Sequence, residues 1–383
     1  MVRGWGRLTS ARRGRVDVEV TSADGGTRSL QAPRVVLATG SQALVPSLPG
    51  LDDTDGPEAT VLTNATLFDL ASPPRHLVIM GAGVIGSEMA FAFARLGSRV
   101  TLVEMADRVL PASEASASEM VGARLEAAGV RVVTGAQVTS VDPSAGAVRV
   151  KAAQEGAASP PALEAADRVL VAVGRRPASR GLGLEDVGVE VDRRGAVPVD
   201  RAYRTRAPGV HAIGDLIGGA FTHAAHEQGR RLVRYLSVPV PLLPERDHPS
   251  VSFTEPEVGQ IGPTLAELQR RWPERLLSVH RVALADTDRG GTMGLSDGFV
   301  QLVALRGSGR LLAATVVAPG AAEMMPLLVS AQHRGTSLWR LSRLEVAYPA
   351  LSQAVRQAAD DFVFSSLPRL HLEIGAYARW RWA

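Results

Sequence analysis

Hydrophobic and polar positions follow a strand–helix–strand pattern between residues 76 and 103. The run from His76 to Met80 is apolar after its first residue and has the length of one buried strand. Val84 to Leu96 then places apolar residues at helical spacing, and Gly97 follows as a helix stop. Val100 to Val103 is a second apolar run. The pattern therefore predicts two buried strands joined by a helix.

The turn between the first strand and the helix carries the spacing G-x-G-x-x-G, with Gly81, Gly83 and Gly86. The first glycine allows a tight turn, the second lets the backbone approach a pyrophosphate, and the third allows close helix–strand packing. Val84 and Ile85 begin the helix, whose N-terminus offers free N–H groups to phosphates. A simple glycine-rich turn is the alternative. The strand and helix on either side favour a dinucleotide site.

Glu104 ends the second strand, where a carboxylate can accept hydrogen bonds from a ribose diol. This position favours NAD over NADP, because a 2′-phosphate would meet a negative charge. Arg108 lies close enough in sequence to accept a 2′-phosphate, so NADP stays open.

Two other apolar runs end in small or polar residues. Val35 to Ser41 reads as a buried strand that enters a loop through Thr39 and Gly40. A shorter run ends at Gly214 and Asp215. A carboxylate at a strand end could bind polyol hydroxyls, and a turn or helix cap is the alternative role.

A proline-rich segment, residues 236–249, is the clearest domain boundary. Beyond it, the pattern predicts an α+β unit with an antiparallel sheet. The expected strands are Val251–Phe253, Leu276–Leu284, Gly298–Leu305 and Arg310–Val317, and the expected helices are Thr264–Arg271, Ala321–Arg334 and Ser352–Phe362.

Composition narrows the class of protein. The chain is 45% hydrophobic and 21% charged, which is typical of globular proteins. Its formal charge is +3 without a dense basic run, which argues against nucleic-acid binding. There is no cysteine, which removes disulfides, thiolate metal sites and thiol nucleophiles, and we expect no metal site. The longest apolar stretch, Leu311 to Ala331, is interrupted by Pro319 and Gly320 and predicts no membrane span. We expect a soluble cytoplasmic protein.

Six segments together resemble the class I pyridine nucleotide–disulfide oxidoreductases, the family of dihydrolipoamide dehydrogenase, mercuric reductase and the soluble transhydrogenases. They occur in family order over nearly the whole chain: VVLATGSQALVPSLPGL, GAGVIGSEMAFAFARLGSRVTLVE, DRVLVAVGRRP, APGVHAIGDLIGGAFTHAAHEQGR, HPSVSFTEPEVGQIGPTLAEL and AYPALSQAVRQAAD.

The resemblance implies an α/β fold in which a Rossmann-type NAD domain is inserted in an incomplete FAD domain. An α+β dimerisation domain follows and would make a homodimer. The implied parts are a partial FAD domain over 1–73, the NAD domain over 74–175, the rest of the FAD domain over 176–245 and the dimerisation domain over 246–383.

The resemblance also implies FAD and NAD(P)H as cofactors and extends the candidate site. It assigns Asp215, after Gly214, to the FAD ribityl chain. It places Thr222 to Ala225 beside the flavin pyrimidine edge, and Gly174 beside the nicotinamide. Thr39 and Gly40 would lie where the chain crosses between the two nucleotide-binding domains.

The chain departs from the family in its chemistry. The family's redox disulfide is missing, and no cysteine elsewhere could replace it, so dithiol–disulfide exchange is excluded. Tyr348 and Gln353 stand around Pro349 at the positions where disulfide reductases place a catalytic His and its Glu. Tyr348 is a tentative catalytic residue near the flavin, and packing at an interface is the alternative.

The family also has a first βαβ unit of ~30 residues for the FAD pyrophosphate. Nothing before Val35 matches it, so the sequence is interpreted as N-terminally truncated. The family counterpart of Glu88 pairs with a lysine in that portion, so Glu88 would lack its cation.

These observations leave two functions open. The first is an FAD-dependent NAD(P)H oxidoreductase that passes hydride to flavin and on to a small non-disulfide acceptor, a second nicotinamide or a quinone. The second is a truncated, inactive NAD-binding paralogue that acts as a dimeric binding or regulatory protein.

Overall fold

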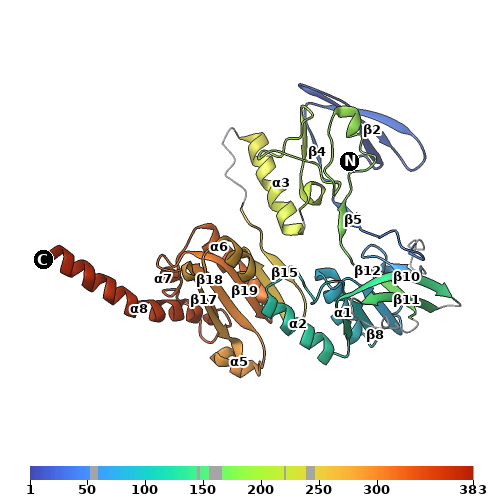
Figure 1. The fold of residues 1–383 in the computed structure, drawn as a ribbon. Coiled ribbons are helices and arrows are strands. Elements are labelled where there is room, and N and C mark those ends of the chain that lie inside the picture. Colours follow the sequence, from blue (N-terminus) through green and yellow to red (C-terminus); the bar gives the residue numbers. More distant parts are fainter. Residues whose placement is uncertain (52–58, 145–146, 155–165, 220, 239–245, 383) are drawn as a thin grey trace. The chain divides into compact units, whose positions relative to one another are not determined.

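The computed structural model describes residues 1–51, 59–144, 147–154, 166–219, 221–238 and 246–382, with side chains at all but 143–154 and 368–382. The described chain forms two compact units. Unit 1 comprises Met1–Leu44 and Gly174–Arg246, and unit 2 comprises Val45–Val173 and Asp247–Ala383 (Figure 1). Half of the predicted boundary 236–249, residues 239–245, lies outside the described residues.

Unit 1 begins with a three-stranded antiparallel sheet in the order β1-β2-β3. The strands are β1 (Trp5–Arg12), β2 (Arg15–Thr21) and β3 (Thr27–Ala32). Val16, Val18 and Val20 alternate with acidic residues along β2, and Val16 and Val20 are buried. Leu8 of β1 is also buried and joins the core of the unit.

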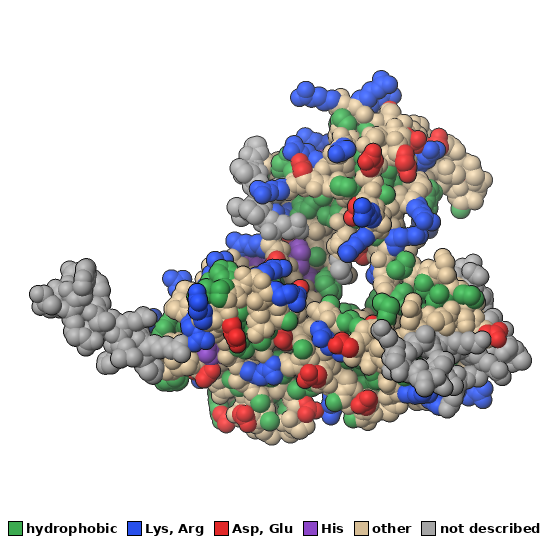
Figure 2. All heavy atoms as spheres, viewed as in Figure 1, with side chains coloured by type: hydrophobic (Ala, Val, Ile, Leu, Met, Phe, Trp, Pro, Cys, Tyr) green, Lys and Arg blue, Asp and Glu red, His purple; other side chains and the backbone are tan. Residues whose placement is uncertain are grey.

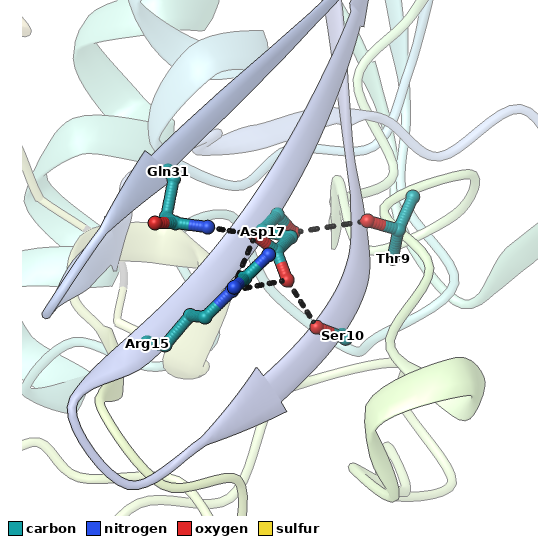
Figure 3. A network of polar contacts seen from close by, with 5 residues as sticks. All are labelled: Thr9, Ser10, Arg15, Asp17 and Gln31. Carbon is teal, nitrogen blue, oxygen red and sulfur yellow. Dashed lines mark hydrogen bonds and ion pairs between the residues drawn. The ribbon is translucent and has the colours of Figure 1, made fainter.

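A polar network crosses this sheet on its solvent side (Figure 3). The Asp17 carboxylate accepts hydrogen bonds from Ser10 Oγ at 2.5 Å, Gln31 Nε2 at 2.9 Å and Arg15 Nε at 3.2 Å. Thr9 Oγ1 donates to the Asp17 carbonyl at 3.3 Å. The hydrogen bonds from Ser10 and Gln31 hold the pKa of Asp17 below its ordinary value. One carboxylate thus links all three strands.

The rest of unit 1 consists of short paired strands and one long helix. β4 (Val35–Leu37) pairs in parallel with β14 (Val210–Ala212), and β5 (Ser41–Ala43) pairs antiparallel with β13 (Arg175–Pro177). The helical elements are η2 (Glu185–Val187), η3 (Gly214–Ile217) and α3 (Thr222–Ser237). The strand predicted over Val35 to Ser41 is therefore shorter and less buried than expected, because it divides into β4 and β5. Val36 is 41% exposed.

The first part of unit 2 is a parallel sheet in the order β6-β12-β7-β8-β9. All five residues of β7 are buried, so the predicted strand–helix–strand pattern is confirmed. The elements are β6 (Val61–Leu62), η1 (Leu67–Asp69), β7 (His76–Met80), α1 (Val84–Arg95), β8 (Arg99–Val103), α2 (Ala115–Ala127), β9 (Arg131–Val133) and β12 (Arg168–Val171), with a hairpin of β10 (Ala136–Ser144) and β11 (Ala147–Gln154).

The second part of unit 2 is an antiparallel sheet in the order β15-β16-β19-β18-β17, which confirms the predicted α+β unit. Its strands are β15 (Ser250–Ser252), β16 (Glu257–Ile261), β17 (Leu277–Ala283), β18 (Phe299–Leu305) and β19 (Leu311–Ala318). Its helical elements are α4 (Leu265–Arg271), η4 (Glu274–Leu276), η5 (Leu284–Asp286), α5 (Asp288–Met293), α6 (Ala321–His333), α7 (Leu338–Leu341) and α8 (Gln353–Trp382). β16 was not predicted, and α8 continues well past the expected end at Phe362.

The two parts of unit 2 share a core and direct hydrogen bonds. Val258 and Phe299 of the antiparallel sheet belong to the apolar cluster of the parallel sheet. Glu114, which precedes α2, donates its N–H to Gln260 Oε1 at 3.0 Å and accepts from Leu265 N at 2.8 Å. The two parts therefore pack as one body, and the four-domain division remains a prediction.

The surface carries charges of both signs. On the face that Figure 2 shows, arginine side chains lie scattered among acidic and uncharged groups. In the part of the chain that the structure describes, no helix combines the length and the apolar character needed to cross a membrane.

Candidate nucleotide-binding sites

The glycine turn of unit 2 connects β7 to α1, and each glycine has a distinct steric environment. Gly81 has φ +95°, and a Cβ there would lie 2.7 Å from the Ala172 carbonyl oxygen. A Cβ at Gly86 would lie 1.8 Å from the Gly81 carbonyl oxygen, so α1 packs directly on the turn. A Cβ at Gly83 would meet nothing within 4 Å. The backbone at Gly83 is therefore open to a ligand, as the sequence predicts.

The N-terminus of α1 has the features of an anion site. Gly83 is the N-cap residue and Val84 and Ile85 form the start of the helix. No side chain caps this end among the described residues, and the first turn contains no acidic residue. The first N–H groups and the positive end of the helix dipole can therefore serve a phosphate.

The Glu104 side chain forms a hydrogen bond to the backbone of the glycine turn. Its Oε2 accepts from Ala82 N at 2.6 Å, and its Oε1 accepts from Ala106 N at 2.8 Å. Each carboxylate oxygen can accept more than one hydrogen bond, so the ribose role remains available. The structural role of Glu104 was not predicted, since no spacing rule links it to Ala82.

A loop after β8 supports the same turn. Leu110 N donates to the Ala82 carbonyl at 2.7 Å, and Ser87 Oγ donates to the same oxygen at 3.0 Å. Leu110 holds a left-handed φ of 45°, which is uncommon for a branched residue. Arg108 Nη2 donates to the Pro111 carbonyl at 3.2 Å, so the guanidinium is engaged within its own loop.

A cavity of about 260 Å³ opens at the carboxyl ends of β7 and β8. Ligands of open α/β sheets bind at this edge. The volume suits one end of a dinucleotide, since whole drug-sized ligands fill ~300–1,000 Å³. The lining includes Gly81, Val103, Glu104, Met105, Ala136, Gln137 and Val138.

Asp215 of unit 1 lies at the start of η3 in a three-residue polar cluster. Its Oδ2 accepts from Ser41 Oγ at 2.5 Å. Arg175 donates to Ser41 twice, from Nε to Oγ and from Nη2 to the carbonyl oxygen, both at 2.7 Å. Arg175 Nε also lies 3.8 Å from Asp215 Oδ2. Among the described residues no donor bonds Oδ1 of Asp215, so this oxygen can accept a ligand hydroxyl.

Ser41 and Arg175 were not predicted as site residues. Both stand inside segments that resemble the family, in TGSQ and VGRRP, but neither spacing indicates that they meet. The antiparallel pairing of β5 with β13 brings them together.

Gly214, the glycine before Asp215, connects η3 to α3 through a hydrogen bond. Gly214 has φ +72°, and its N–H donates to Gln228 Oε1 at 2.8 Å. A Cβ at Gly214 would lie 3.3 Å from Ala225 Cβ. Thr222 is the exposed first residue of α3. The predicted site residues Gly214, Asp215 and Ala225 therefore lie together, with Thr222 one helical turn before Ala225.

Thr39, Gly40 and Gly174 have structural contacts in unit 1. Thr39 Oγ1 donates to the Ala178 carbonyl at 2.9 Å, and the Gly40 carbonyl accepts from Ala178 N at 2.9 Å. The Gly174 carbonyl accepts from Leu44 N at 3.0 Å. These bonds fix the loop between β4 and β5 against the segment around β13.

Tyr348 lies in unit 2 before α8, and it is 72% exposed. Gln353, at the start of α8, is 8% exposed. The Tyr348 ring is therefore not packed in the core of its own chain, and its catalytic role remains a prediction.

Glu88 is half-buried on α1, and its Oε1 accepts from Phe253 N at 2.8 Å. Burial raises the pKa of Glu88, and the hydrogen bond from Phe253 opposes this effect. Among the described residues of unit 2, the Glu88 carboxylate is therefore bound by a backbone N–H group of the antiparallel part and not by a cation.

The chain matches two family models. Residues 6–229 match the model described as pyridine nucleotide-disulphide oxidoreductase. Residues 248–359 match the dimerisation domain of the same group.

Individual proteins of known name are similar over most of the chain. The mitochondrial dihydrolipoyl dehydrogenase of Dictyostelium discoideum is 34% identical over 94% of this chain and 72% of its own length. Dihydrolipoyl dehydrogenase 3 of Pseudomonas aeruginosa is 33% identical over 94% of this chain and 74% of its own length. The crystal structure of LpdA from Mycobacterium tuberculosis has a TM-score of 0.83 at 29% identity, covering 94% of this chain and 76% of that one.

Proposed function

Since the chain belongs to the pyridine nucleotide-disulphide oxidoreductase family and is therefore an oxidoreductase, we propose that it passes hydride from NAD(P)H to FAD and on to a non-disulfide acceptor. One observation carries the second half of this proposal: none of the 383 residues is a cysteine. Dithiol–disulfide exchange requires a thiolate in the protein. In the proposed route, electrons leave the flavin for the acceptor without a sulfur relay.

The glycine turn of unit 2 is the proposed NAD(P)H site. The N-terminus of α1 binds the pyrophosphate, and the open backbone at Gly83 lets it come close. Glu104 accepts hydrogen bonds from the adenosine ribose, which favours NAD. Arg108, the residue that could accept a 2′-phosphate, bonds the Pro111 carbonyl instead.

Unit 1 supplies the proposed flavin contacts. Oδ1 of Asp215 accepts a ribityl hydroxyl while Ser41 and Arg175 hold Oδ2. The segment from Thr222 to Ala225 lies next to Gly214 and faces the flavin pyrimidine edge. When bound, the nicotinamide and the flavin supply the hydride chemistry, and the protein binds, orients and shields them.

The acceptor is a small oxidant, and a second nicotinamide or a quinone fits a site without thiols. Tyr348 contributes a contact near the flavin, and its exposed ring suits a surface that a second subunit covers. We accordingly propose a homodimer formed through the region that matches the dimerisation domain.

A second candidate function rests on the glycine pattern. The sequence has one G-x-G-x-x-G, and it lies at Gly81 to Gly86, in the proposed NAD(P)H site. A chain that binds NAD(H) there without retaining flavin would act as a dimeric binding or regulatory protein.

The test is reconstitution of the purified chain with FAD, followed by NADH oxidation with different acceptors. We expect bound flavin with an absorbance band near ~450 nm and turnover with a quinone or a nicotinamide analogue, but none with lipoamide. Asp215→Ala should lower flavin retention, whereas Ser308→Ala, a change at an exposed turn, should not.

Turnover with lipoamide would contradict the proposed route. NADH binding by a folded chain that takes up no flavin would favour the regulatory alternative.

A further inference from the structure

Three polar side chains in the antiparallel part of unit 2 form a hydrogen-bonded series that no cofactor role uses. Ser278 and His280 lie two residues apart on β17, and Asp361 lies on α8, which packs against β17 (Figure 1). Ser278 Oγ is 2.5 Å from His280 Nε2, and His280 Nδ1 is 2.6 Å from Asp361 Oδ2. This order, hydroxyl to imidazole to carboxylate, is the arrangement that activates a serine nucleophile.

The imidazole is held in one orientation by its surroundings. His280 is 5% exposed, and its ring meets Phe362 edge to face with centroids 5.4 Å apart. Phe362 in turn meets Trp339 at 5.3 Å. An ionised carboxylate can only accept a hydrogen bond, so the proton of the neutral imidazole lies on Nδ1, facing Asp361. The lone pair of Nε2 then faces the Ser278 hydroxyl.

The edge of the sheet supplies a donor for a developing oxyanion. In the sheet order of the described strands, β17 is at the edge. Leu276 O accepts from Arg306 N, and Leu284 N donates to Gly298 O. The backbone groups of the even-numbered residues of β17 therefore form the hydrogen bonds to β18. The N–H of Val279 therefore points toward the open edge. It belongs to the residue after the serine, as one oxyanion donor does in serine hydrolases.

We propose that Ser278 is a base-activated nucleophile that accepts acyl groups from small carboxylic esters. As Ser278 Oγ attacks the ester carbon, its proton passes to His280 Nε2 and the carbonyl electron pair moves onto oxygen beside the Val279 N–H. The ester C–O bond then breaks, and the leaving alkoxide takes the proton from Nε2. Water, deprotonated by the same nitrogen, releases the acid and restores Ser278.

The surroundings define the class of substrate and the role of each residue. Ser278 is half-buried on β17, the strand against which α8 packs, so a short acyl group such as acetyl fits best. Among the described residues, His280 is the hydrogen-bond partner of the Asp361 side chain, which is 62% exposed. Asp361 is therefore a positioning residue that acts through the imidazole. The reaction uses neither the glycine turn nor Asp215, so it goes beyond the oxidoreductase function and does not depend on it.

The test is labelling of the full chain with a fluorophosphonate, with peptide mass spectrometry to locate the adduct, and release of p-nitrophenol from p-nitrophenyl acetate. We expect the adduct on Ser278 and none in Ser278→Ala. His280→Gln should slow labelling by at least ~100-fold, the usual contribution of a general base. Ser308→Ala, at an exposed serine without an imidazole partner, is the matched control and should label like the wild type.

Asp361→Asn keeps the exposed position folded and tests the positioning role. It should slow ester cleavage roughly tenfold or more and change the pH profile of the rate, and Asp361→Glu should restore the profile. A folded wild-type chain without an adduct on Ser278 would overturn the proposal. Labelling of His280→Gln at the wild-type rate would overturn it equally. Flavin content plays no part in either readout.

Discussion

Glu104, Asp215 and Glu88 are three carboxylates whose surroundings give them different roles. Both oxygens of Glu104 accept backbone N–H bonds, one from Ala82 in the glycine turn and one from Ala106 after β8. Asp215 accepts from Ser41 through Oδ2, and among the described residues no donor bonds its Oδ1. Glu88 accepts one backbone N–H and is half-buried. The sequence places an acid at each position, but only the folded backbone shows which oxygen atoms are already engaged.

Glu88→Gln should stabilise the chain near neutral pH. Burial raises the pKa of Glu88 in the folded state, so folding favours its protonated form. The wild type therefore loses stability as the pH rises from the unfolded pKa, about 4.3, through the folded value. Glutamine keeps an oxygen for the Phe253 N–H and carries no charge. In urea unfolding from pH 4 to 8, the unfolding free energy of the variant should increase relative to that of the wild type as the pH rises.

A constant difference between the two proteins across that range would contradict this account. Glu119→Gln, at an exposed position on α2, is the control and should leave the pH dependence unchanged.

At the scale of elements, the predictions succeeded where burial and glycine spacing coincide. β7, α1 and β8 follow the predicted pattern because β7 and nearly all of β8 are buried and Gly97 ends the helix. β1 and β3 were missed because exposed polar side chains interrupt both strands, so no apolar run marks them. β16 was missed because Gly259 and Gln260 interrupt its apolar pattern.

The contacts of the candidate site were harder to predict than its glycines. Ser41, Arg175 and Asp215 meet because β5 pairs with β13, and that pairing joins residues far apart in sequence. No local pattern encodes such a contact. Likewise, Glu114 links α2 to α4 through backbone N–H groups that the sequence does not reveal.

Gly83→Ala and Gly86→Ala should separate ligand binding from folding. A methyl group at Gly86 would clash with the Gly81 carbonyl oxygen, so Gly86→Ala should cost about 1–3 kcal/mol of unfolding free energy. A methyl group at Gly83 meets open space, so Gly83→Ala should fold normally and lose NADH affinity. Chemical denaturation and NADH fluorescence titration measure the two effects. If Gly83→Ala bound NADH like the wild type, the pyrophosphate would not approach this backbone.

At the scale of the whole molecule, the family assignment shows an oxidoreductase, and the absence of cysteine from the sequence is the basis of the proposed sulfur-free route. The chain matches pyridine nucleotide-disulphide oxidoreductases over both units, yet it contains no cysteine. The sequence alone predicts both the family match and the absence of cysteine, because motif order and residue content can be read directly from it.

Anaerobic titration of the FAD-loaded chain with NADH tests the central claim most directly. The account predicts that one NADH per flavin bleaches the ~450 nm band completely, and that a quinone or nicotinamide analogue restores it. A flavin that stays oxidised in the presence of saturating, bound NADH would contradict the account, because nicotinamide and flavin would then not share a site.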